Sequence, residues 1–343
     1  MKTKSTVGLL ALISVAAVAF FVVKSQKKSD QNQQQTNTVQ AQNEESSSAV
    51  LASNKTLEKS FTFKNLRLYP IRATSTKGNS ADSYLSLREA LKAKKIKIKE
   101  TEGGSGEVNT LYFSNVSKDT VYLMSGEIVQ GGKQDRVIAE DMIVPPGQVE
   151  QPVSVFCVEQ GRWQYNDAKP DGEFKEYYGS ASMKLREVVA KEKNQSKVWQ
   201  EVSRSNQKNE VASTTQAYTA QKKSGDYQKK YKEYYDFFKN KFAQEKNIIG
   251  VTGVTGKRVI GSDMFASPVL FQRQFPSILS AYVNEAITDG AKVELNTTEV
   301  KGYMKEVFSA SADTTAVAGK KGKMFKYKGK ALHYSTYSKA KKK

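Results

Sequence analysis

Charged and amide side chains gather in the stretch from Tyr122 to Trp163, around two turns rich in glycine and proline. They fall at the ends of short apolar runs, where strand ends and loops commonly build sites. Arginine meets a carboxylate or phosphate with two parallel donors, so Arg136 and Arg162 are candidate anion partners, and Trp163 offers a stacking face. We therefore expect a site for an anionic or sugar-phosphate ligand, built from Glu127, Lys133, Gln134, Asp135, Arg136, Glu159, Gln160, Arg162, Trp163 and Asp263.

The same residues support two other hypotheses. Glu127 and Glu159, with Asp263 as a third carboxylate, are the candidate acid–base groups of a hydrolase, which in glycoside hydrolysis lie about 5–9.5 Å apart. Alternatively, the acidic and basic side chains pair with one another and hold the loops together, because an unpaired buried charge is costly. The sequence assigns no catalytic residue and leaves open whether the protein is an enzyme.

Residue counts restrict the chemistry further. The chain has one cysteine, Cys157, and one histidine, His333, so it cannot form an intramolecular disulfide and lacks the ligands of an ordinary zinc site. A nucleophile pair of these two residues has no local signature. The glycine-rich run at 250–257 lacks the spacing and the Ser or Thr of a phosphate-binding loop. A Ca²⁺ or Mg²⁺ site built from carboxylates stays open but has no support in the sequence, so we expect no metal and no other cofactor.

Hydrophobic periodicity predicts an α+β fold with a β-rich N-terminal half. Strands are expected at 61–69, 96–100, 111–113, 121–124 and 153–158, the first ending at Pro70. A hairpin-like connection is expected between the third and fourth of these strands. One helix is expected over 84–94, capped by Asp82 or Ser83. The turns at Gly131–Gly132 and Pro145–Gly147 leave the candidate residues near strand ends.

The middle of the chain, residues 172–246, changes to a helical period. One helix face carries an aromatic stripe, for which core packing is favoured over a base-stacking surface: Tyr227, Tyr231, Tyr234, Phe238 and Phe242. The C-terminal half is expected to hold β-hairpins and helices. These are a hairpin turning at 255–257, a helix opened by Ser267, another after a capping box at 296–299, and a terminal hairpin.

Two segments resemble a known family. The run Gly-Glu-Ile-Val-Gln-Gly-Gly-Lys-Gln-Asp-Arg at 126–136 and the run Cys-Val-Glu-Gln-Gly-Arg-Trp at 157–163 are similar to the ADP-ribosylglycohydrolase- and rhodanese-phosphatase-superfamily-associated protein domain. Weaker likenesses follow in the same order at 195–199, 261–271 and 332–334. The resemblance covers roughly residues 60–338. It implies no activity and supplies no catalytic residues.

The N-terminal segment, residues 1–23, has the pattern of a signal peptide or membrane anchor. Lysines flank an uncharged run, and Ala17-Val18-Ala19 offers a cleavage site with small residues. Residues 24–56 are rich in Gln, Asn and Ser, which is typical of a disordered linker. We expect one α+β domain over 57–338, a basic tail at 339–343, and an exported protein of the cell envelope, periplasmic or membrane-tethered.

The charge balance suggests partners. The formal net charge is +19, and from Thr314 onward the chain has ten lysines and no acidic residue. Such a surface attracts anionic lipid headgroups or acidic envelope polymers, with nucleic acid a disfavoured partner; alternatively, the lysines only keep the protein soluble. Membrane contact is expected through the N-terminal segment. The basic helical half from Lys191 to Lys246 supports a further hypothesis, a partner-binding scaffold. The sequence does not indicate the oligomeric state.

Overall fold

The computed structural model describes residues 55–57, 59–73, 80–100, 109–162, 173–312 and 322–337 of the 343-residue chain. The predicted signal segment, the linker up to residue 54, the basic tail and Trp163 lie outside the described residues. Within those residues, no helix is both long and apolar enough to cross a membrane. The first strand begins at Lys55, two residues before the predicted start of the domain.

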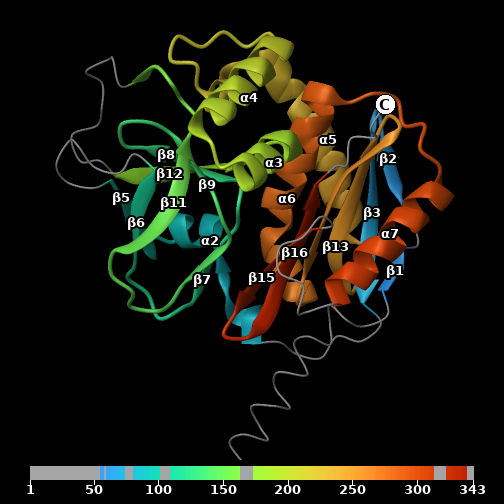
Figure 1. Ribbon diagram of the computed structural model, residues 1–343, viewed down its shortest axis with the longest axis horizontal. Helices are drawn as coiled ribbons and strands as arrows, with labels where there is room; N and C mark the ends of the chain where they lie inside the picture. The colour runs from blue at the N-terminus through green and yellow to red at the C-terminus, as the bar shows by residue number, and fades with distance from the viewer. Residues whose placement is uncertain are drawn as a thin grey trace, which may run out of the picture. The chain divides into compact units, whose positions relative to one another are not determined.

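The fold is α+β, as predicted, and its largest sheet has seven antiparallel strands (Figure 1). The strand order is β1-β3-β13-β14-β16-β15, and β2 pairs with β3. Both predicted hairpins are present, and the β13–β14 hairpin accounts for the glycine-rich run. The strands are β1 (Lys55–Leu57), β2 (Phe61–Phe63), β3 (Leu66–Ala73), β13 (Ile248–Thr255), β14 (Arg258–Phe265), β15 (Lys323–Tyr327) and β16 (Lys330–Tyr337).

The expectation that the first strand ends at Pro70 is wrong, because β3 continues through it to Ala73. On one side of β3, Pro70 lies opposite Val251 of β13. On the other side, β2 pairs only up to Leu68 and β1 pairs only from Ile71. Proline cannot donate a ladder hydrogen bond, and here it occupies the gap between two partner strands, where no donor is required.

The remaining strands form a six-stranded antiparallel sheet, in the order β12-β8-β9-β11-β6-β5, and a small sheet in the order β10-β7-β4. The predicted connection between the third and fourth strands is not a hairpin, because β6 and β7 belong to different sheets. The strands are β4 (Leu85–Ser86), β5 (Ile96–Lys99), β6 (Thr110–Asn115), β7 (Val121–Leu123), β8 (Glu127–Gly131), β9 (Arg136–Ile138), β10 (Met142–Val144), β11 (Gln151–Cys157) and β12 (Phe174–Ser180).

A buried asparagine explains the separation of β6 from β7. The amide of Asn115 donates to the carbonyl oxygens of Asp119, Val144 and Pro145, at 2.7, 3.1 and 3.0 Å. It therefore fastens the end of β6 to the turn after β10, and the chain between β6 and β7 passes from one sheet to the other. A short helix, α2 (Leu87–Lys92), follows β4; it is capped by Ser86 through a capping box, not by Asp82 or Ser83.

Helices cover both faces of the large sheet. Helix α6 packs on one face and also contacts β12 of the six-stranded sheet, while α7 packs on the other face with Val300, Met304 and Val307 (Figure 1). The aromatic stripe of α5 is core packing, as predicted. The helices are η1 (Ser80–Ser83), α3 (Met183–Glu192), α4 (Gln195–Lys208), η3 (Tyr218–Lys223), α5 (Gly225–Ala243), α6 (Pro268–Asp289) and α7 (Thr297–Ala312).

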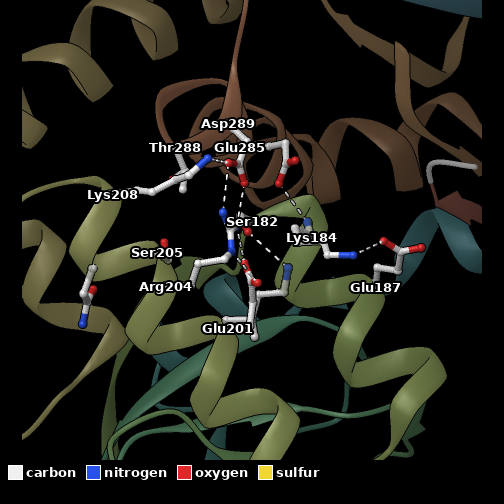
Figure 2. Close-up of polar contacts among 12 residues, drawn as sticks. Ser182, Lys184, Glu187, Glu201, Arg204, Ser205, Lys208, Glu285, Thr288 and Asp289 are labelled. Atoms are coloured by element: carbon white, nitrogen blue, oxygen red, sulfur yellow. Dashed lines mark hydrogen bonds and ion pairs between the residues drawn. The ribbon is translucent and has the colours of Figure 1, made fainter. Parts of the chain in front are cut away.

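Ion pairs fasten α4 to the end of α6. Figure 2 shows Arg204 between Glu201 of its own helix and Asp289 of α6, with Lys208 reaching the same Asp289. Arg204 meets each carboxylate with a pair of donors, at 2.6–2.9 Å. Two arginine–carboxylate forks in one place fix geometry better than isolated surface pairs do.

Candidate functional site

A polar pocket of about 700 Å³ opens where the ends of β8 and β12 meet the segment between α4 and η3. Its volume lies in the range of small-molecule sites. Three predicted site residues, Asp135, Glu159 and Arg162, line it. The rest of the lining was not among the predicted site residues and is Gln130, Gly131, Glu176, Ala212, Ser213, Thr214, Thr215, Ala217, Thr219, Ala220 and Lys223. We call this cavity the polar pocket.

The backbone around Gly131 sets up the floor of the polar pocket. Gly131 and Gly132 both have positive φ, +145° and +49°, a conformation that favours glycine. A Cβ on Gly131 would lie 2.3 Å from the carbonyl oxygen of Glu173, so β8 and β12 can approach only because the side chain is absent. The turn that follows places Asp135 at the pocket.

Asp135 accepts hydrogen bonds from four separate groups. Its Oδ1 is 3.3 Å from the Gly131 backbone nitrogen and 3.0 Å from the Arg162 guanidinium. Its Oδ2 is 2.6 Å from the Thr219 hydroxyl and 3.3 Å from the Gln130 amide. Such hydrogen bonding compensates for the loss of water around a carboxylate whose residue is only 3% exposed.

Arg162 connects the two carboxylates. Its Nη2 lies 3.0 Å from Asp135 and 2.9 Å from Glu159, so the two bonded oxygens are within about 6 Å of each other. The same guanidinium donates to the carbonyl oxygens of Lys133 and Gly131, at 3.1 and 2.9 Å. We call Asp135, Glu159 and Arg162 the floor clamp. The positive charge of Arg162 is already compensated within this clamp.

Glu159 has a raised pKa within the floor clamp. Burial raises its pKa, and the neighbouring Asp135 carboxylate raises it further against the opposing effect of Arg162. Glu159 also joins the floor to the wall of the pocket, because it forms a β-bridge with Ala217. Next to it, Gly161 donates to the carbonyl oxygen of Thr215 at 2.8 Å. The segment carrying Ser213 to Thr219 is thus held against the floor.

The rim of the polar pocket offers groups of both hydrogen-bonding kinds. Glu176 and Lys223 are exposed there, and Ser213 and Thr214 add hydroxyl groups to the lining. Among the described lining residues, three are acidic and two are basic, and one of the basic ones is the compensated Arg162. The rim can therefore accept from and donate to a ligand with several hydroxyl groups.

Four other predicted residues lie around the floor without lining the pocket. Arg136 is 2% exposed, and its guanidinium donates to the Glu100 carboxylate at 3.1 Å and to the carbonyl oxygen of Gln134 at 2.6 Å. Gln134 donates to the carbonyl oxygen of Gln160, at 3.2 Å, and Lys133 donates its backbone N–H to Glu100. These contacts involve the Arg136 guanidinium, the Gln134 amide and the Lys133 backbone, and they hold the loop.

Glu127 lies away from the polar pocket, in the interior. Its carboxylate accepts from Tyr177, Ser277 and the Met124 backbone, at 2.7, 2.9 and 2.9 Å. Burial raises the pKa of Glu127 to about 7, although these hydrogen bonds oppose the change. Because Glu127 and Asp263 are both fully buried and neither lines the pocket that contains Glu159, the structure does not bring the three carboxylates of the hydrolase hypothesis to one cavity.

Asp263 belongs to a buried charge centre that links three parts of the fold. Arg186 of α3 binds both its oxygens, at 3.2 and 2.9 Å. His333 of β16 bridges Asp263, at 3.1 Å, and Asp141, at 2.7 Å. Burial alone would lower the pKa of His333, but the two carboxylates outweigh it and raise that pKa to about 9. We call Arg186, Asp263, His333 and Asp141 the buried charge centre.

The sole cysteine does not belong to this centre. Both ring nitrogens of His333 are hydrogen-bonded to carboxylates. The backbone N–H of Cys157 donates to the Gln195 side-chain oxygen, and its carbonyl oxygen accepts from the Gln195 side-chain nitrogen. Burial raises the pKa of the Cys157 thiol, which disfavours the reactive thiolate. Among the residues that the structure describes, no three His, Cys, Asp or Glu side chains are placed to hold a metal ion.

The sequence signal for the missed pocket residues was weak. Ser213, Thr214 and Thr215 form a short polar cluster between two helical segments, which predicts a loop but not its position. Asp141 and Arg186 had no signal at all, because each is an ordinary charged residue whose partners are distant in sequence. Lys223 and Glu176 also have no sequence signal, and only the structure shows that they line the polar pocket.

The sequence profile of the ARG and Rhodanese-Phosphatase-superfamily-associated Protein domain matches residues 54–341. The chain belongs to this family. The match confirms the resemblance carried by the 126–136 and 157–163 runs. The polar pocket and the buried charge centre both lie within the ARG and Rhodanese-Phosphatase-superfamily-associated Protein domain. The chain matches no curated protein and no solved structure.

Proposed function

We propose that this protein is a ligand-binding domain of the cell envelope, and that its polar pocket binds a sugar or sugar phosphate. One observation carries the proposal: a preformed pocket has a hydrogen-bonded floor clamp and a rim of hydroxyl, amide, carboxylate and ammonium groups. Such groups are the donors and acceptors that a polyhydroxylated ligand requires, and a fixed floor limits the entropy lost on binding. The envelope location rests on the N-terminal pattern, and cell fractionation checks it.

In this proposal, the two exposed charged side chains of the rim bind different parts of the ligand. Glu176 is not part of the floor clamp and would accept from ligand hydroxyls, while Lys223 would meet a phosphate group. Arg162 has a different task in this proposal. Its Nε and Nη2 groups are bonded to Asp135, Glu159 and two carbonyl groups, so it mainly keeps the floor in shape, and only its Nη1 group is left for a ligand.

Calorimetry with monosaccharides, sugar phosphates and nucleotides tests the proposal, after a thermal-shift screen selects the compounds. Glu176→Gln is expected to weaken every bound sugar about tenfold, because a hydrogen bond to a charged group contributes about 1.5–3 kcal/mol. Lys223→Gln is expected to weaken only phosphorylated ligands. Both residues are exposed, so neither change should disturb the fold.

Two matched variants serve as controls. Glu192→Gln and Lys230→Gln remove the same charges at exposed positions outside the polar pocket and should leave binding unchanged. The proposal fails if no compound in the panel binds saturably. It also fails if the pocket variants bind as tightly as the controls.

A further inference from the structure

A second cavity, of about 530 Å³, lies at the tip of the β13–β14 hairpin. Its walls are the hairpin turn, the segment after α6, and the first turns of α7. The lining includes the apolar side chains of Val259, Ala291 and Leu295 and the ring of Tyr303, and the rest is Thr255, Gly256, Lys257, Arg258, Asp289 and Glu299. We call it the apolar pocket. It shares no lining residue with the polar pocket.

Backbone hydrogen bonds hold two walls of the apolar pocket together. Gly256 donates to the carbonyl oxygen of Ala291 at 2.9 Å and accepts from the backbone of Glu294 and Leu295, at 2.9 and 3.1 Å. Gly256 has φ +53°, and a Cβ there would lie 3.3 Å from Ala291. The Thr255 hydroxyl adds a contact with the Ala291 backbone nitrogen, at 3.0 Å. The cavity is therefore preformed, which reduces the cost of ordering it around a ligand.

The acidic side chains at the rim already have partners. Figure 2 shows the Asp289 carboxylate turned toward Arg204 and Lys208 of α4. Glu299 accepts from the Asn296 backbone nitrogen at 3.0 Å and so caps α7.

The basic side chains and the tyrosine hydroxyl are also engaged. Arg258 pairs with the buried carboxylate of Glu285 at 2.8 Å, and Lys257 lies 3.1 Å from Glu294. Tyr303 shares a 2.7 Å hydrogen bond with Thr336 through its hydroxyl, so the cavity meets its ring. Within the described residues, the lining thus presents methyl groups and a ring face. Each of its charged side chains already has a partner, Asp289 and Arg258 in arginine–carboxylate pairs and Lys257 and Glu299 in exposed contacts.

We propose that the apolar pocket binds an uncharged small molecule with an aromatic ring. A ligand that buries apolar surface against these methyl groups and the Tyr303 ring gains binding free energy, and an aromatic ring adds a favourable pair with Tyr303. A charged ligand would lose its hydration without gaining an uncompensated partner, which disfavours it. The site is independent of the sugar site proposed above.

Three probes with the same ring test this inference on the full chain. They are indole, which is neutral, indole-3-acetate, which is anionic, and tryptamine, which is cationic. Indole is expected to shift the backbone amide signals of Gly256, Val259 and Tyr303 saturably in ¹H–¹⁵N NMR spectra. The two charged probes are expected to bind at least fivefold more weakly. Equal or tighter binding of either charged probe, or shifts that do not map to this cavity, would overturn the proposal.

A pair of variants gives a second reading. Val259→Trp places a ring in the cavity and should abolish the indole shifts. Val149→Trp adds the same ring at a position that is 70% exposed, and it should bind indole as the unchanged chain does. Retained indole binding in a folded Val259→Trp protein would overturn the proposal. If circular dichroism shows that this variant does not fold, the shift map of the unchanged chain decides alone.

Discussion

At the scale of single residues, His333 has the most consequential surroundings. It is 1% exposed, stacks on Phe265 with ring centroids 4.3 Å apart, and is bonded to Asp141 and Asp263. Arg186 adds a second positive charge to the same centre, so two cations and two carboxylates compensate one another. A buried ion network of this kind is strongly destabilised when one member is lost.

The charge state of His333 predicts how stability depends on pH. An unfolded histidine has a pKa near 6.5, and the buried carboxylates raise the pKa of His333 to about 9 in the folded protein. The folded state therefore binds more protons between these values. We expect the free energy of unfolding to be largest below pH 6.5 and to fall as the pH rises to 9, by up to about 3 kcal/mol. Urea unfolding across this range measures it.

The control for this prediction is His333→Gln. This variant should be less stable at pH 6, and its stability should change less between pH 6.5 and 9 than that of the unchanged chain. Burial lowers the pKa of Lys55 to about 8, but that lysine is common to both proteins and cancels in the comparison. Equal pH slopes in the two proteins would show that His333 is not held protonated.

Residue-scale chemistry was only partly predictable from the sequence. Asp135, Glu159 and Arg162 could be singled out because charged residues beside glycine turns and apolar runs tend to meet at strand ends. The buried charge centre could not, because Asp141 and His333 are 192 positions apart. No local period or spacing relates them, and only the pairing of β16 with β14 brings His333 to Asp263.

At the scale of elements, the turn before β8 depends on a close approach to α3. Gly126 has φ +91°, and a Cβ there would lie 2.4 Å from Cγ of Arg186. Arg186 is fully buried and forked onto Asp263, so it cannot move aside without breaking that pair. The turn, the helix and the buried charge centre are therefore fitted to one another.

Gly126→Ala is expected to destabilise the protein by more than about 2 kcal/mol, because it combines backbone strain with a clash against a fixed side chain. Gly225→Ala is the matched control, since nothing lies within 4 Å of its added Cβ at the start of α5. That control should be neutral or slightly stabilising. Thermal unfolding of the two variants checks this, and a similar midpoint for both would contradict the proposed fit between Gly126 and Arg186.

The sequence could predict the elements that depend on interactions between residues close together in the chain. The β13–β14 hairpin, the Ser267 cap of α6 and the capping box at 296–299 depend on residues adjacent in sequence. The predictions were wrong where residues distant in sequence decide how a strand pairs. Pro70 lies inside a strand because two separate partners leave a gap beside it, and β6 parts from β7 because Asn115 bonds to residues 29 and 30 positions away.

At the scale of the described domain, the last described strand connects the seven-stranded sheet to the rest of the fold. β16 lies between β14 and β15 in the seven-stranded sheet. Its His333 reaches Asp141, which follows β9 of the six-stranded sheet, and α6 contacts strands of both. The strand nearest the end of the described chain is therefore central to the fold rather than an addition to it.

This placement predicts the effect of two truncations. Removing residues 322–343 should abolish cooperative urea unfolding followed by near-ultraviolet circular dichroism, because it exposes the edge of β14 and leaves Asp141 and Asp263 without His333. Removing only 338–343 takes away four lysines and should preserve the transition. If the larger truncation kept a cooperative transition at the same midpoint, β16 and His333 would not be needed to hold the seven-stranded sheet to the rest of the fold.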